Sequence, residues 1–134
     1  MDLDRTPPAI ANAAAEELRA LNHRTLGPTK AYKNAPEISE VVSALTTLIE
    51  RMPQALQQAE AGLETFYDRN EIRLAAADSS QKALAEAVST VAVSLQYARN
   101  GLASVLRELK SAAGPLSNMG GHWPDDEDGP ADEA

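Results

Sequence analysis

The chain has 134 residues, which suits one domain, and it lacks cysteine, which excludes disulfide bonds, thiolate metal sites and a cysteine nucleophile. Only one Phe, one Trp and three Tyr are present, and a composition rich in Ala, Leu and Glu favours α-helix. The net charge is −8, but six of the 20 acidic residues lie in residues 115–134, which contain no Lys or Arg. The rest is nearly neutral, with 14 acidic and 12 basic residues, which argues against general nucleic-acid binding by the whole molecule.

The N-terminal residues predict no export signal, because Met1-Asp2-Leu3-Asp4 lacks a basic region followed by an apolar run. No uncharged apolar run approaches the roughly 18 residues needed to span a bilayer. The sequence therefore predicts a cytoplasmic protein that does not enter a membrane.

The first predicted helix covers residues 8–25. Pro7-Pro8 suits a first helical turn, and Gly27-Pro28 suits a helix stop. Its apolar face contains Ile10, Ala14, Leu18 and Leu21.

A basic window, residues 19–33, spans the end of this helix and the connector that follows. It contains no acidic residue. Three interpretations are open: contact with a phosphate or an acidic partner in an accessory nucleic-acid-binding protein, a solvated connector, or a contact with the chain's own acidic tail. The residues concerned are Arg19, Arg24, Lys30, Tyr32 and Lys33.

The second predicted helix covers residues 37–67. One apolar series in it alternates steps of three and four residues, which is the heptad rule of coiled coils, and a second series beside it widens the apolar stripe. The first series passes through Pro53 without a phase shift, so one kinked helix is expected rather than two helices. The first series is Val42, Leu45, Ile49, Met52, Leu56, Ala59, Leu63 and Phe66; the second is Ile38, Val41, Leu45, Leu48, Met52, Ala55 and Ala59.

The third predicted helix covers residues 79–113, after a polar connector at 68–78. Asp78 with Gln81 resembles a capping box at its start, and Gly114-Pro115 predicts its stop. Small residues flank its apolar series and would let a partner backbone come close. The series is Leu84, Val88, Val91, Leu95, Ala98, Leu102, Val105 and Leu109.

These elements predict an all-α fold. The two long helices form an antiparallel hairpin, and the shorter first helix completes a three-helix bundle over residues 1–114. Residues 115–134 are predicted to be a disordered acidic tail. Because the first helix can cover only half of the hairpin, some apolar surface remains, which predicts a homo-oligomer.

Catalytic and metal-binding motifs are missing from the sequence. The two histidines, His23 and His122, have no second histidine at helical spacing, and no Gly-x-Ser-x-Gly turn or glycine-rich phosphate loop occurs. Glu60, Glu64 and Asp68 form an acidic row that we interpret as a solvated helix face. The sequence thus predicts no enzyme, no metal and no cofactor.

The tail contains the single tryptophan, Trp123. A large aromatic residue in an acidic, disordered segment suits a docking peptide for a protein partner, while the alternative is that Trp123 folds back onto the bundle. The acidic residues beside it are Asp125, Asp126, Glu127 and Asp128.

Two family resemblances can be stated. The runs Leu21-Asn22-His23-Arg24-Thr25-Leu26 and Met52-Pro53-Gln54-Ala55-Leu56, with an Ala-rich last helix, resemble uncharacterised small helical actinobacterial proteins associated with mobile elements. That resemblance implies no activity. The length, the helical character and a Tyr-x-x-x-Glu pattern at Tyr67 and Glu71 are similar to WXG100-type hairpins, which implies a small secreted protein that dimerises. The Trp-x-Gly turn of that family is missing.

The leading hypothesis is a non-enzymatic helical interaction or adaptor protein that forms oligomers. The alternatives are a small secreted WXG100-like hairpin effector and an accessory nucleic-acid-binding protein that uses residues 19–33.

Overall fold

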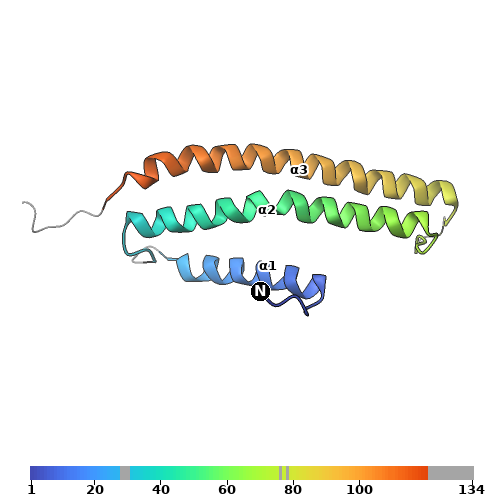
Figure 1. Cartoon of the computed structure of the whole chain (residues 1–134), viewed down its shortest axis with the longest axis horizontal. Helices are drawn as coiled ribbons and strands as arrows, with labels where there is room; N and C mark the ends of the chain where they lie inside the picture. Colours follow the sequence, from blue (N-terminus) through green and yellow to red (C-terminus); the bar gives the residue numbers. More distant parts are fainter. Residues whose placement is uncertain (28–30, 76, 78, 121–134) are drawn as a thin grey trace, which may run out of the picture. The chain divides into compact units, whose positions relative to one another are not determined.

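The computed structural model describes residues 1–27, 31–75, 77 and 79–120, and within them the chain is all-α without a strand (Figure 1). It divides into two units, one that contains Met1–Ile38 and one that contains Ser39–Met119. We describe each unit by itself. The all-α fold predicted from the sequence is confirmed, while the packing of the first helix on the other two stays a prediction.

Helix α1, Pro7–Thr25, begins one residue earlier than predicted and ends at the predicted residue. Thr6 is its N-cap and accepts a hydrogen bond from the backbone N–H of Ala9 (3.4 Å), while Pro7 and Pro8 occupy the first turn, where a missing N–H costs nothing. The helix ends before Gly27, whose φ of 147° is a backbone conformation that favours glycine. None of its residues is buried.

Helix α2, Ala35–Asp68, begins two residues earlier than predicted. Asn34 caps it, because its side-chain oxygen accepts from the backbone N–H of Glu37 at 3.0 Å. The carboxylate of Glu37 in turn accepts from the backbone N–H of Lys33, which satisfies a second unpaired donor at the helix start. Pro36 then lies in the first turn, where proline is accepted.

A single helix passes through Pro53, as the unbroken heptad phase predicts. Proline has no N–H, so the carbonyl of Ile49 loses its usual helical partner. Pro53 is half-buried on one face of α2, and this packing supports a helix that the residue itself disfavours.

Helix α3, Gln81–Ser117, differs from the prediction at both ends. Its N-cap is Ser80, whose Oγ accepts from the backbone N–H of Ala83 at 3.1 Å, so the proposed capping box that used Gln81 as its third helical residue is wrong. Asp78 itself lies outside the described residues. The predicted stop at Gly114-Pro115 is also wrong, because the helix continues to Ser117.

A proline in the last turn explains why α3 continues. The fixed φ of Pro115 is compatible with helix, so only one hydrogen bond is lost there, and Leu116 is half-buried. The hydroxyl of Ser117 donates to the carbonyl of Gly114 at 2.7 Å, which partners one of the carbonyls exposed at the helix end. Residues 115–117, which the sequence predicts to belong to a disordered tail, are therefore helical, and residues 121–134 lie outside the described part of the chain.

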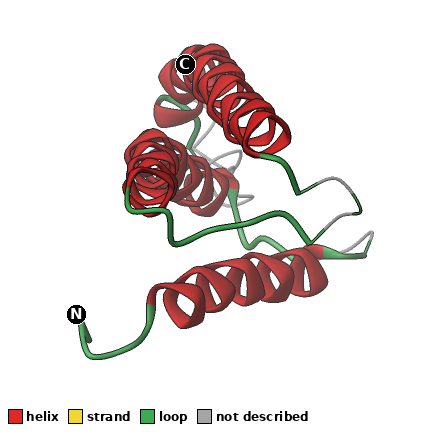
Figure 2. Cartoon of the chain, turned by 90° about the vertical axis from the view of Figure 1, so that its right-hand side faces the viewer, coloured by secondary structure: helices red, strands yellow, loops and turns green. Residues whose placement is uncertain are grey.

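Helices α2 and α3 lie side by side as an antiparallel hairpin (Figures 1 and 2). Arg99 donates to the carboxylate of Glu60, and the ammonium of Lys110 lies 3.0 Å from the carboxylate of Glu50. Between these pairs α2 runs back by ten residues while α3 advances by eleven, so the two contacts determine one antiparallel register.

The contact between the two helices, here called the seam, follows a heptad pattern. With Val42 and Val88 at position a, every a and e position from Val42 to Tyr67 on α2 and from Ala85 to Leu116 on α3 is half-buried. Positions d and g are half-buried as well in the first part of α2, at Val41, Leu45 and Leu48. The predicted apolar series, at positions a and d, is half-buried at all its a positions, whereas its d residues Met52, Phe66, Val91 and Val105 are exposed. The seam residues around the ion pair are Ile49, Pro53, Leu56, Glu60 and Leu63 on α2 and Ala92, Leu95, Arg99, Leu102 and Leu106 on α3.

Candidate functional site

The d positions from Met52 to Phe66 on α2 and from Val91 to Val105 on α3 form an exposed apolar surface, here called the open face. Met52 and Phe66 on α2 are 37% and 49% exposed, and Val91 and Val105 on α3 are 40% and 45% exposed. Ala59 lies one heptad from both Met52 and Phe66, and Ala98 lies one heptad from both Val91 and Val105. Both alanines are exposed as well. Exposed side chains of this size at regular intervals on both helices indicate an interaction surface.

Both rows of the open face lie on the same side of the hairpin. In an antiparallel helix pair, equivalent heptad positions flank the seam on the same side, and the contact between Glu60 and Arg99, both at e, fits this rule. The register of the two ion pairs places Met52 within three residues of the level of Val105, and Phe66 within three residues of the level of Val91. The four large side chains therefore lie at the two ends of one surface, with Ala59 and Ala98 between them.

The g positions beside the open face are small and uncharged along this stretch. They are Ala55 and Gly62 on α2, and Ser94 and Gly101 on α3. A Cβ atom added to either glycine would meet no atom within 4 Å, so open space lies beside both. Another helix could thus approach the backbone closely here.

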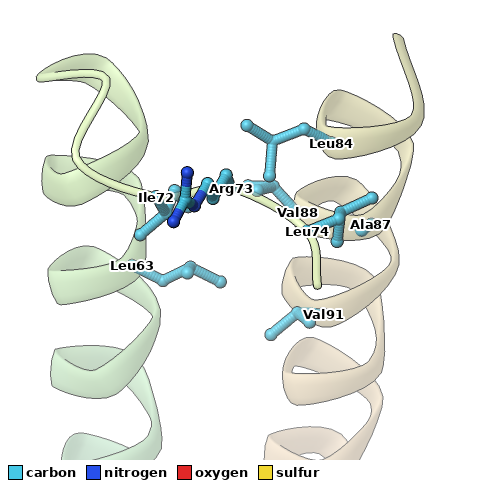
Figure 3. A pocket seen from close by; sticks show the side chains of 8 residues that line it. All are labelled: Leu63, Ile72, Arg73, Leu74, Leu84, Ala87, Val88 and Val91. Carbon is cyan, nitrogen blue, oxygen red and sulfur yellow. The ribbon is translucent and has the colours of Figure 1, made fainter. Parts of the chain in front are cut away.

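The loop end of the hairpin shows how such a surface is covered. Leu84, at position d of α3, is 8% exposed and is the one buried hydrophobic residue in the described part of the chain. The connector after α2 carries Ile72 and Leu74 to it, and together with Leu63 and Val91 they line a shallow hollow of about 250 Å³ (Figure 3). The connector thus covers the d side of α3 near Leu84, and the open face begins where this cover ends.

The structure describes four of the five residues that the sequence proposes for a phosphate contact in the basic window. Arg19 pairs with Glu16 (3.1 Å) on the same helix, and Tyr32 is half-buried rather than free to stack on a base. Arg24 and Lys33 are exposed, and Lys30 lies outside the described residues. The nucleic-acid interpretation of residues 19–33 stays a prediction.

The residues predicted for the acidic docking peptide, Trp123, Asp125, Asp126, Glu127 and Asp128, all lie outside the described residues. Their role stays a prediction.

The acidic row on α2 is only partly the solvated face that we predicted. Glu60 is half-buried and paired with Arg99, whereas Glu64 and Asp68 are exposed. Within residues 1–27, 31–75, 77 and 79–120, no group of three or more His, Asp or Glu side chains could hold a metal ion. None of the helices described there has an apolar stretch sufficient to cross a membrane.

Comparisons with known proteins add no relative. No protein-family model matches the chain, and no curated protein or solved structure matches it significantly.

Proposed function

We propose that this chain is a non-enzymatic protein–protein interaction protein and that the open face of its hairpin is the binding surface. One observation carries the proposal: Met52, Phe66, Val91 and Val105 expose apolar side chains at matching levels on one side of the hairpin. Burial of such side chains against a partner is favourable by about 25 cal/mol per Å² of apolar surface.

The low burial within the chain supports the same conclusion. Leu84 is the one buried hydrophobic residue among those described. Small domains with little core gain stability when a partner binds the folded form. The acidic tail with Trp123 is a second candidate contact, which rests on its sequence alone.

Affinity capture with the full chain tests the proposal when matched variants are compared. Val105→Glu places a charge on the open face, whereas Val93→Glu places the same charge on the same helix at a similarly exposed valine (48%) outside that face. We expect the proteins captured by the unsubstituted chain to be retained by Val93→Glu and lost by Val105→Glu. The proposal would be overturned if both variants captured equal amounts of protein. It would also be overturned if the unsubstituted chain stayed monomeric and captured no more protein than a tag control.

The tail is tested in the same experiment. A chain without residues 121–134 and a Trp123→Ala chain should both lose part of the captured protein if the tail is a docking peptide, because one large aromatic residue would supply most of its apolar contact. Unchanged capture by both would restrict the binding surface to the hairpin.

A further inference from the structure

We infer that the hollow at the loop end of the hairpin is an anchor site for a partner peptide in which a large apolar side chain lies next to a carboxylate. This inference rests on the proposed function, because it names the chemistry of the partner that the hairpin binds. Its support is an arginine without an ion pair that lines an otherwise apolar hollow.

The walls of the hollow are apolar. Seven of the eight residues that line this hollow of about 250 Å³ are apolar, and Leu84, which is 8% exposed, is the most buried of them. Sites that hold a whole small molecule begin at roughly 300 Å³, whereas the anchor of a protein interface is one large side chain in a pocket of the partner. The hollow adjoins the open face, because Val91 belongs to both. One large apolar side chain of a partner on that face therefore fits the hollow.

Arg73 supplies the charge of the site. It is the eighth residue that lines the hollow, and Figure 3 shows its side chain among the apolar ones. The side chain is exposed, and none of the ion pairs in the described part of the chain includes it. A guanidinium group can bind a carboxylate through two parallel hydrogen bonds. The hollow and Arg73 together therefore match an apolar side chain with an acidic neighbour.

The chain's own tryptophan has this chemistry, because acidic residues follow Trp123, but it cannot reach the hollow of the same chain. Ser117, the last residue of α3, lies 26 residues after Val91, which is about 39 Å along the helix. The six residues from Ser117 to Trp123 span at most about 21 Å. The peptide that we infer belongs to another protein.

Selection from a random peptide library displayed on phage, with the full chain as bait, tests the inference. We expect enrichment of peptides in which Trp, Phe or Leu lies within two residues of Asp or Glu. Arg73→Glu should weaken binding of a selected peptide by about tenfold or more and should select basic neighbours instead, because attraction becomes repulsion. Arg69→Glu is the matched control, because Arg69 is also exposed but does not line the hollow, and the acidic preference should persist.

A neutral variant separates binding from folding. Ala87→Phe adds a large apolar side chain to the wall of the hollow, so peptide binding should be lost while the helix content measured by circular dichroism is retained. Ala103→Phe is its control, because this exposed alanine also lies in α3 but does not line the hollow.

Selection of no peptide by the unsubstituted chain, or an acidic preference that Arg73→Glu leaves unchanged, would overturn the inference. Selection of peptides only by a Leu18→Glu chain, whose α1 stripe is disrupted, would overturn it in favour of α1 as the occupant. A dimer that Arg73→Glu dissociates would overturn it in favour of a second copy.

The proposed function is judged separately. If no peptide is selected but Val105→Glu still abolishes affinity capture, the proposed function stands and the hollow is not its anchor site. If the chain binds neither peptides nor proteins, both fail.

Discussion

Glu60 of α2 and Arg99 of α3 form an ion pair across the seam, 39 residues apart in sequence, and their side chains are only 18% and 23% exposed. The pair lies among apolar seam residues and helps to determine the register of the hairpin. Because the pair is half-buried, its loss should cost more than the loss of a surface pair and less than the loss of a fully buried one.

We therefore expect Arg99→Met to lower the free energy of unfolding by about 1 to 2 kcal/mol, since it leaves the Glu60 carboxylate without its partner. Urea denaturation measures this value. The double variant Glu60→Leu/Arg99→Met should recover most of the loss, because two apolar side chains can replace a buried ion pair. The exposed pair of Lys110 and Glu50 is the control, and Lys110→Met should cost less than about 1 kcal/mol. Equal effects at both pairs would show that Glu60 and Arg99 are solvated.

Leu84 stabilises the loop end of the hairpin. Leu84→Ala should cost about 2 to 4 kcal/mol, because it removes the buried side chain around which Ile72 and Leu74 gather. Val93→Ala, at an exposed position in the same helix, should change stability by less than about 0.5 kcal/mol. Hydrogen exchange should also show faster exchange at the start of α3 in the Leu84 variant. A cost similar to that of Val93→Ala would mean that the connector does not pack on Leu84.

Pro53 lies inside a continuous helix, so its replacement should stabilise the protein. Pro53→Ala restores a backbone hydrogen bond to Ile49, and we expect a gain of about 1 to 3 kcal/mol, reduced by the lost contact of a half-buried side chain. Thermal denaturation followed by circular dichroism measures it. Pro36→Ala, in the first turn of the same helix, should give no comparable gain. Destabilisation by Pro53→Ala would indicate that α2 is two helices.

Ser80 caps α3. Ser80→Ala should cost about 0.5 to 2 kcal/mol, because the backbone N–H of Ala83 loses its acceptor. Ser79→Ala, one residue earlier and outside the helix, is the matched control and should have little effect. If the two variants melt at the same temperature, the helix begins elsewhere, as the sequence had suggested with Asp78.

The sequence predicted the three helices because their signals are local. The signals are a proline in a first turn, a heptad repeat and a glycine after a last turn, and each one depends only on residues that are close together in the sequence. Two predictions of that kind failed where local signals compete: Ser80 and Asp78 are both good caps, and Gly114-Pro115 is a stop that a helix can pass through when Leu116 packs.

The sequence by itself determined the all-α class, the two long helices, the continuity through Pro53 and the apolar stripe at positions a and d. Only the tertiary structure decided which part of that stripe is used within the chain. A hydrophobicity pattern identifies the apolar residues but not the neighbour that each one meets, and it cannot find Glu60 and Arg99 in a seam because both are charged. The antiparallel register brings these two together and leaves Met52, Phe66, Val91 and Val105 exposed, because one neighbouring helix can cover only one side of a stripe that is wide enough for two.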